Sequence, residues 1–189
     1  MNSMLEHVPT EEQRQVLNEC LRCRGLIVGS YAHVEFLLAD LCIKSWRLPS
    51  YRSLAKRFPY KSETRERAVS AILALEAGPL FEFRAAAAPL LKEWRDSERD
   101  RNIMAHGLVT IEWTKGDNVF VRGQLLKPID DEKFGLERVK WSLSTLQAKA
   151  GRATKCSQGW MRVCYAMHSK MSWIRSDGVP VGLFKDDSS

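Results

Sequence analysis

The feature that most constrains the fold is a long series of apolar residues at helical spacing near the start of the chain. They recur between positions 16 and 46, as Val16, Leu17, Cys20, Leu21, Ile27, Val28, Tyr31, Val34, Leu38, Leu41 and Cys42. Side chains three and four residues apart share one face of a helix, so this pattern predicts one long helix with a buried stripe. Gly25 and Gly29 fall inside it, and the sequence leaves open whether they permit close packing or break the helix.

Helical patterns continue along most of the chain. Thr10 and Gln13 have the spacing of a capping box, which places the start of the long helix. A short basic helix is expected after the Leu48-Pro49-Ser50 stop, and further helices over 62–76, from Gly78-Pro79 to about 106, and within 128–175. The last region shows two apolar stripes, one through Leu136, Val139, Leu143 and Leu146, the other through Cys156, Trp160, Val163, Met167, Met171 and Ile174.

The period changes from helical to alternating after residue 107. Val109, Ile111 and Trp113 alternate with polar residues, residues 115–118 form a turn sequence, and alternation resumes at Val119 and Val121. A β-hairpin is expected at about 108–126. The predicted fold is therefore mainly α, an up-and-down helical bundle with one inserted β-hairpin. It forms a single domain over 1–189, with an ordered core of about 10–175 and a polar C-terminal tail.

Hydropathy and cysteine usage indicate a cytoplasmic protein with no membrane association. No apolar run approaches the roughly 20 residues that span a bilayer, and the N-terminus lacks the basic-then-apolar order of a secretory signal. Four of the five cysteines (Cys20, Cys42, Cys156 and Cys164) fall in apolar helical stretches, where a reduced thiol packs as a small hydrophobe. Cys20 and Cys23 have metal-ligand spacing, but no second pair accompanies them, so packing is favoured over zinc and no metal is expected.

The net charge of +6 is concentrated in two segments. Residues 52–67 carry Arg52, Lys56, Arg57, Lys61, Arg65 and Arg67 against two glutamates, and residues 152–175 carry Arg152, Lys155, Arg162, Lys170 and Arg175 with no acid. Such segments are either solvated helix faces or surfaces that bind a polyanion such as RNA. The RNA-binding interpretation assigns this role to Arg52, Lys56, Arg57, Lys61 and Arg65.

A cluster at the end of a charged helix, Arg101-Asn102-Ile103-Met104-Ala105-His106-Gly107, carries candidate chemistry. Asn102 and His106 are four residues apart and share a helix face. Imidazole exchanges protons near neutral pH, and guanidinium offers a planar set of donors suited to phosphate oxygens. The cluster therefore fits phosphodiester cleavage by a ribose 2′-hydroxyl. The pattern alone favours an ordinary helix end, with His106 against the helix dipole and Gly107 in the left-handed conformation.

This cluster resembles the Arg-Asn-x-x-x-His motif of the HEPN superfamily of ribonucleases. The resemblance implies that Arg101 stabilises the phosphate, His106 is the acid and base, and Asn102 orients one of them. It also implies metal-independent cleavage of single-stranded RNA without a cofactor, in a homodimer whose two motifs line one cleft. Many members are toxins or phage-defence nucleases, so an antitoxin or regulatory protein is an expected partner. Others have lost activity, and a noncatalytic RNA- or protein-binding module is the alternative function.

Two further positions follow from the resemblance. Glu35 resembles a polar position that faces the site in some members, although a solvent-facing or ion-paired glutamate explains it equally well. His33, two residues away and on another face, is expected at the surface. Leu108 occupies the position of a tyrosine that a partner nucleotidyltransferase modifies in some toxins, so that mode of inhibition is not expected. The role of the hairpin is left open.

Overall fold

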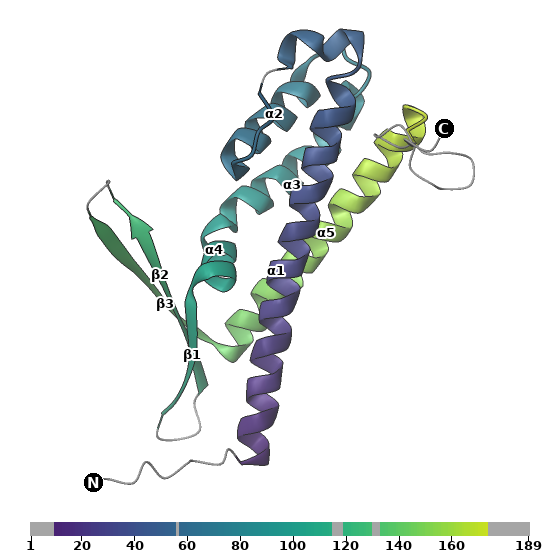
Figure 1. The fold of residues 1–189 in the computed structure, drawn as a ribbon. Helices are drawn as coiled ribbons and strands as arrows, with labels where there is room; N and C mark the ends of the chain where they lie inside the picture. Colours follow the sequence, from purple (N-terminus) through teal and green to yellow (C-terminus); the bar gives the residue numbers. More distant parts are fainter. Residues whose placement is uncertain (1–9, 56, 115–118, 130–132, 174–189) are drawn as a thin grey trace, which may run out of the picture. The chain divides into compact units, whose positions relative to one another are not determined.

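The fold is mainly α-helical with a small antiparallel sheet (Figure 1). It is known from a computed structural model, which describes residues 10–55, 57–114, 119–129 and 133–173. The elements are α1 (Glu11–Ser45), the 3-10 helix η1 (Pro49–Leu54), α2 (Ser62–Ala74), the 3-10 helix η2 (Phe81–Phe83), α3 (Arg84–Asp96), α4 (Glu98–His106), β1 (Leu108–Trp113), β2 (Val119–Pro128), β3 (Phe134–Ser142) and α5 (Leu143–Lys170).

The chain divides into two compact units. The sheet unit comprises the chain up to Gly29 together with Arg99–Thr154, and the helical unit comprises Ser30–Glu98 together with the chain from Lys155 onward. The sheet unit thus holds the first part of α1, nearly all of α4, the three strands and the start of α5. The boundaries at 29 and 154 fall inside continuous helices, which is why no linker composition marks them in the sequence.

The long first helix forms as predicted. The Thr10 hydroxyl accepts a hydrogen bond from the Gln13 amide at 3.2 Å, and the Gln13 side chain accepts one from the Thr10 amide at 2.9 Å. The capping box is therefore confirmed. Neither glycine breaks the helix, and a Cβ built on Gly25 or Gly29 would meet nothing within 4 Å, so close packing does not explain them either.

Helix α1 is more apolar than expected. It contains an 18-residue window of mean hydropathy 1.6 with no more than two charged residues, so by length and composition it could cross a membrane. The expectation that no stretch comes near that length was therefore too strict. One such helix is weak support for a membrane span, because the core helix of a water-soluble protein meets the same criteria. The residues of α1 that are almost fully buried include Ile27, Val34, Leu38 and Leu41.

The sheet differs from the expected hairpin. The predicted pairing of β1 with β2 is confirmed, with Leu108 opposite Gln124 and Trp113 opposite Val119. The turn at 115–118 lies outside the described residues. A third strand, β3, pairs antiparallel with the full length of β2, so the order is β1-β2-β3 (Figure 1). The prediction of a lone hairpin ending at 126 was wrong.

Strand β3 was missed because Leu136 and Val139 have helical spacing and were assigned to a helix. The two residues are three apart, which suits a helix, but as strand residues they lie on opposite faces. Leu136 is 44% exposed, whereas Trp141 is buried opposite Val121. This strand forms because it pairs with β2, and the spacing of residues within the segment does not predict such a pairing. Helix α5 consequently begins only at Leu143.

The helix expected from Gly78-Pro79 to 106 is divided in three. The short η2 is followed by α3, and the buried Ser97 separates α3 from α4. The Ser97 hydroxyl donates to Glu93 at 3.1 Å, which gives the break a local partner. The apolar line through Ala87 and Trp94 therefore does not run on to Arg101. Residues 174 and 175 of the expected core, and the polar tail, lie outside the described residues.

The helical unit buries a charged cluster. Asp40 Oδ2 lies 2.9 Å from Lys44 Nζ and 3.0 Å from His168 Nε2, and all three side chains are about a tenth exposed or less. Burial by itself raises the pKa of Asp40, but the contacts with His168 and Lys44 outweigh it, so the pKa is held below its usual value. The carboxylate of Asp40 neutralises the buried ammonium group of Lys44.

Replacing Asp40 with asparagine removes this negative charge and leaves Lys44 buried without its counter-ion. We expect Asp40→Asn to lower the free energy of unfolding by about 3 kcal/mol at pH 7, measured by urea unfolding. Because the pKa of Asp40 is lowered in the folded state, its contribution is present above about pH 4 and is lost as the pH falls further.

The difference between the two proteins should therefore shrink below pH 4. Asp96→Asn is the matched control, because Asp96 lies on the surface of the same unit and pairs with Lys92. It should change the stability little. Equal effects of the two substitutions would show that burial gives Asp40 no special role.

Candidate functional site

The three motif residues lie on α4, in the sheet unit. This helix is fixed by Ile103 and Met104, which are fully buried. Gly123 of β2 makes room for Ile103, because a Cβ built on it would lie 2.4 Å from the Ile103 Cγ2 atom. The helix therefore packs directly against the middle strand, and its remaining faces carry the polar residues.

Ion pairs hold the start of α4. Asp100 pairs with Lys149 of α5, and both side chains are mostly buried. Arg99 pairs with Glu137 of β3. The hydrogen bonds from Lys127 and Arg99 keep the pKa of Glu137 below its usual value, so this carboxylate is charged at neutral pH. The two residues immediately before Arg101 therefore anchor α4 to β3 and to α5.

The last turn of α4 has a partner on α1. Arg24 donates from Nε to the carbonyl oxygen of Met104 at 2.8 Å. Carbonyl groups in the last turn of a helix lack partners within the helix, and a cation there also complements the helix dipole. Arg24 therefore supports the end of α4 on which His106 lies.

Asn102 positions the guanidinium of Arg101. Its Oδ1 accepts hydrogen bonds from Arg101 Nε at 3.3 Å and from Nη2 at 3.1 Å, and both residues are half-buried. On a helical wheel Arg101 lies about 140° from His106, whereas Asn102 shares the face of His106. The bonds to Asn102 therefore turn the guanidinium toward the face on which the imidazole lies.

His106 is the last residue of α4 and is exposed. Gly107 follows it, but not in the left-handed conformation that an ordinary helix end predicts. A Cβ on Gly107 would lie 2.5 Å from the carbonyl oxygen of Ile103 and 2.7 Å from that of Gln124. Glycine is therefore required by the close approach of two backbone segments, and that part of the prediction was wrong. The imidazole at this end is open to solvent.

Glu35 lies in the helical unit, where it has partners of its own. Ser62 donates to its Oε1 at 2.9 Å, and Arg65 Nη1 lies 3.9 Å from its Oε2. The ion-paired alternative therefore describes it. The expectation that His33 is a surface residue was wrong, because it is half-buried with its Nδ1 3.1 Å from the hydroxyl oxygen of Ser157.

The basic segment 52–67 also lies in the helical unit. Arg52, Arg57 and Lys61 are exposed, and Lys56 lies outside the described residues. Arg65 is buried and donates to the carbonyl oxygen of Tyr60 at 3.0 Å. Its guanidinium therefore serves the fold, which does not suit the phosphate contact expected of it.

The cysteines behave as apolar core residues, which confirms the packing prediction. All five are buried and free. Burial raises the pKa of the Cys23 and Cys156 thiols to about 11, and that of the Cys42 and Cys164 thiols to about 12. None is a thiolate nucleophile at neutral pH. Among the described residues, no group of three or more His, Cys, Asp or Glu side chains could hold a metal ion.

Comparison of the chain with protein-family models, curated proteins and solved structures finds no match. The candidate site therefore stands on its geometry. Sequence reasoning missed Arg24 and Lys149 as neighbours of the motif. A signal was present, since Arg24 interrupts the apolar stripe between Cys20 and Ile27, and a charged residue in such a stripe usually has a specific partner.

The close approach at Gly107 gives a stability prediction. Gly107→Ala places a methyl group against two carbonyl oxygens, so we expect the free energy of unfolding to fall by about 1–3 kcal/mol. Gly25→Ala in the same unit is the matched control. It meets open space inside a helix and should raise the stability by about 0.5–1 kcal/mol. Thermal or urea unfolding measures both, and a stabilising Gly107→Ala would contradict the described backbone contact.

Proposed function

We propose that the protein is a metal-independent endoribonuclease of the HEPN class that cleaves single-stranded RNA. The observation that carries the proposal is the arrangement at the end of α4. An exposed imidazole lies one helical turn beyond an asparagine, and that asparagine holds a guanidinium. The anchoring of α4 by buried side chains and ion pairs keeps these groups in fixed positions, which catalysis requires.

The chemistry follows from the two side chains. His106 takes the proton of a ribose 2′-hydroxyl, whose oxygen attacks the adjacent phosphorus. The bond from phosphorus to the 5′-oxygen breaks, and an imidazolium returns a proton to that oxygen. Arg101 donates to the nonbridging oxygens, on which negative charge accumulates. The products are a 2′,3′-cyclic phosphate and a 5′-hydroxyl, with no metal or cofactor taking part.

A homodimer is part of the proposal. One histidine would have to act first as base and then as acid, whereas a two-fold dimer supplies two histidines and two arginines to a shared cleft. In the HEPN class such nucleases act in toxin–antitoxin systems or phage defence. We therefore propose a cytoplasmic enzyme under the control of an antitoxin or another regulatory protein.

A second function, a noncatalytic RNA-binding module, is supported by the exposed cations of the helical unit, Arg52, Arg57 and Lys61. Such a protein binds RNA with an affinity that falls steeply with salt but releases no products. Turnover distinguishes the two functions.

The test is cleavage of single-stranded RNA in excess chelator. We expect His106→Ala and Arg101→Ala each to lower kcat by at least about 100-fold, because each removes one group that acts in the transition state. Asn102→Ala should lower it less, since it only loosens the guanidinium. The rates are measured on a labelled oligonucleotide in single-turnover conditions.

Two controls accompany these variants. An oligonucleotide with deoxyribose at the cleaved position should remain intact, because it lacks the nucleophile. Arg84→Gln, an exposed substitution on α3 outside both basic segments, should leave the rate unchanged. Full activity of folded His106→Ala would rule out the proposed chemistry.

A further inference from the structure

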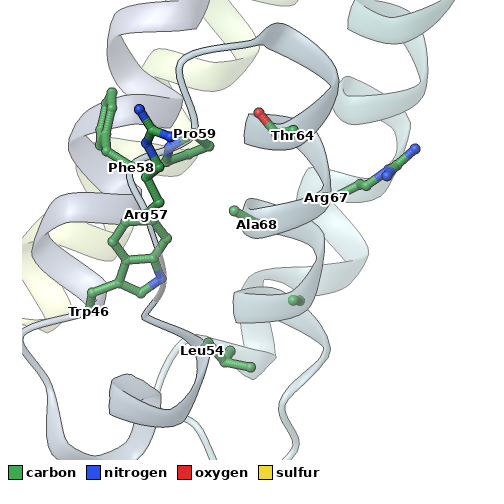
Figure 2. Close-up of a pocket in the computed structure, with 9 residues that line it drawn as sticks. Trp46, Leu54, Arg57, Phe58, Pro59, Thr64, Arg67 and Ala68 are labelled. Carbon is green, nitrogen blue, oxygen red and sulfur yellow. The ribbon is translucent and has the colours of Figure 1, made fainter.

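A groove of about 520 Å³ lies within the helical unit, apart from the residues of the motif. One side is formed by Trp46, which follows α1, and by the segment after η1, and the other by α2. Figure 2 shows Trp46 and Arg57 on one side of it and Thr64 and Ala68 on the other. Most of the lining is apolar, contributed by Trp46, Leu54, Phe58, Pro59, Ala68 and Ala71. This size and composition are typical of a site that holds a flat organic ring.

Two polar groups of the groove, one a donor and the other an acceptor, are available for hydrogen bonds with a ligand. The indole Nε1 of Trp46 is buried and has no acceptor among the described residues. The hydroxyl of Thr64 donates to the carbonyl oxygen of Lys61 at 2.7 Å, so its lone pairs are left to accept. A ring that fits here offers an acceptor to Trp46 and a donor to Thr64. Nucleobases carry both on their edges.

The lining of the groove includes an exposed arginine. Arg57 lines it and is exposed, and within the described parts of the chain no ion pair or hydrogen bond engages its guanidinium. Arg52 and Lys61 are exposed nearby in the sequence, and their side chains likewise have no described partner. Arg67 differs, because it pairs with Glu63 and points away from the groove in Figure 2. Lys61 directly precedes α2 and is bonded through its carbonyl oxygen to Thr64 of the lining, so Arg57 and Lys61 together favour a chain of phosphates over one small anion.

An exposed aromatic ring continues the apolar surface. Tyr60 is 73% exposed, and its ring packs edge-on against Phe58 with centroids 5.0 Å apart. Aromatic side chains beside cations are the common means of binding single-stranded nucleic acid, because every base can stack on them. An acidic peptide would use the cations but would leave the apolar groove unfilled.

We propose that this groove binds one base of a single-stranded RNA, with the neighbouring phosphates on Arg57 and Lys61. The inference rests on the proposed function in taking RNA as the ligand, and it adds a binding site outside the catalytic motif. Trp46 donates to the base, Phe58 covers it, and Tyr60 stacks on the adjoining base. The groove contributes affinity and selects single strands, since a paired base cannot enter it.

The test measures binding separately from cleavage. Labelled single-stranded RNA is titrated with the full-length His106→Ala protein, which binds without turnover, and fluorescence anisotropy gives the Kd. Adding Arg57→Gln should raise the Kd about tenfold and reduce the slope of log Kd against log salt by about 1. Adding Trp46→Phe, which keeps the ring but removes the donor, should raise the Kd about threefold without changing that slope.

Arg84→Gln is the matched control, because it removes an exposed arginine of the same unit that belongs to neither basic segment and does not line the groove, and it should leave the Kd within twofold. Circular dichroism confirms that each variant is folded, and Arg57→Gln tests the groove even if Trp46→Phe unfolds. An unchanged Kd in folded Arg57→Gln would overturn the proposal. So would an oligoglutamate that displaces RNA as well as unlabelled RNA does, which would indicate a site for acidic protein.

The outcome separates the two proposals. Loss of RNA affinity in Arg57→Gln, together with a wild-type protein that cleaves nothing, would support the groove and remove the nuclease. Cleavage that depends on His106, with a Kd that is unchanged by Arg57→Gln and Trp46→Phe, would support the nuclease and remove the groove as an RNA site.

Discussion

The contact between α4 and the middle strand of the sheet is the constraint on which the candidate site depends. Ile103 fills the space left by Gly123, and Gly107 brings the chain within reach of the Gln124 carbonyl oxygen. Once Ile103 faces the sheet, helical geometry directs Asn102 away from it, and His106 is the exposed last residue of the helix. A catalytic imidazole must be open to its substrate, and this packing leaves His106 exposed while the helix that carries it is held firmly.

The charges around α4 fall into two groups with different tasks. Asp100 pairs with Lys149, and Arg99 pairs with Glu137. Both ion pairs hold the helix in place. Arg101 is bonded to the neutral amide of Asn102, which orients the guanidinium. A guanidinium held in one orientation is suited to the charge that develops on a phosphate in a transition state. The same logic explains why Arg65, buried against carbonyl oxygens, is unsuited to a phosphate.

Local patterns predicted the parts of the fold that local physics determines. The capping box at Thr10, the long stripe of α1 and the alternation of β1 and β2 were all readable from neighbouring residues. Strand β3 was not, because Leu136 and Val139 fit a helix in isolation and only pairing with β2 decides between the alternatives. The motif residues were found by their chemistry, whereas Arg24 was missed, since its partner is 80 residues away. The groove beside Trp46 likewise comes from two segments with no shared sequence pattern.

The central claim is that His106 and Arg101 drive attack by a ribose 2′-hydroxyl on its own phosphodiester. The most direct measurement is the ³¹P NMR spectrum of the products formed from a short RNA in excess chelator. We expect a 2′,3′-cyclic phosphate that is formed by the wild-type protein and is absent with His106→Ala. A product that carries a 5′-phosphate would contradict it, because a water molecule and not the ribose would then be the nucleophile.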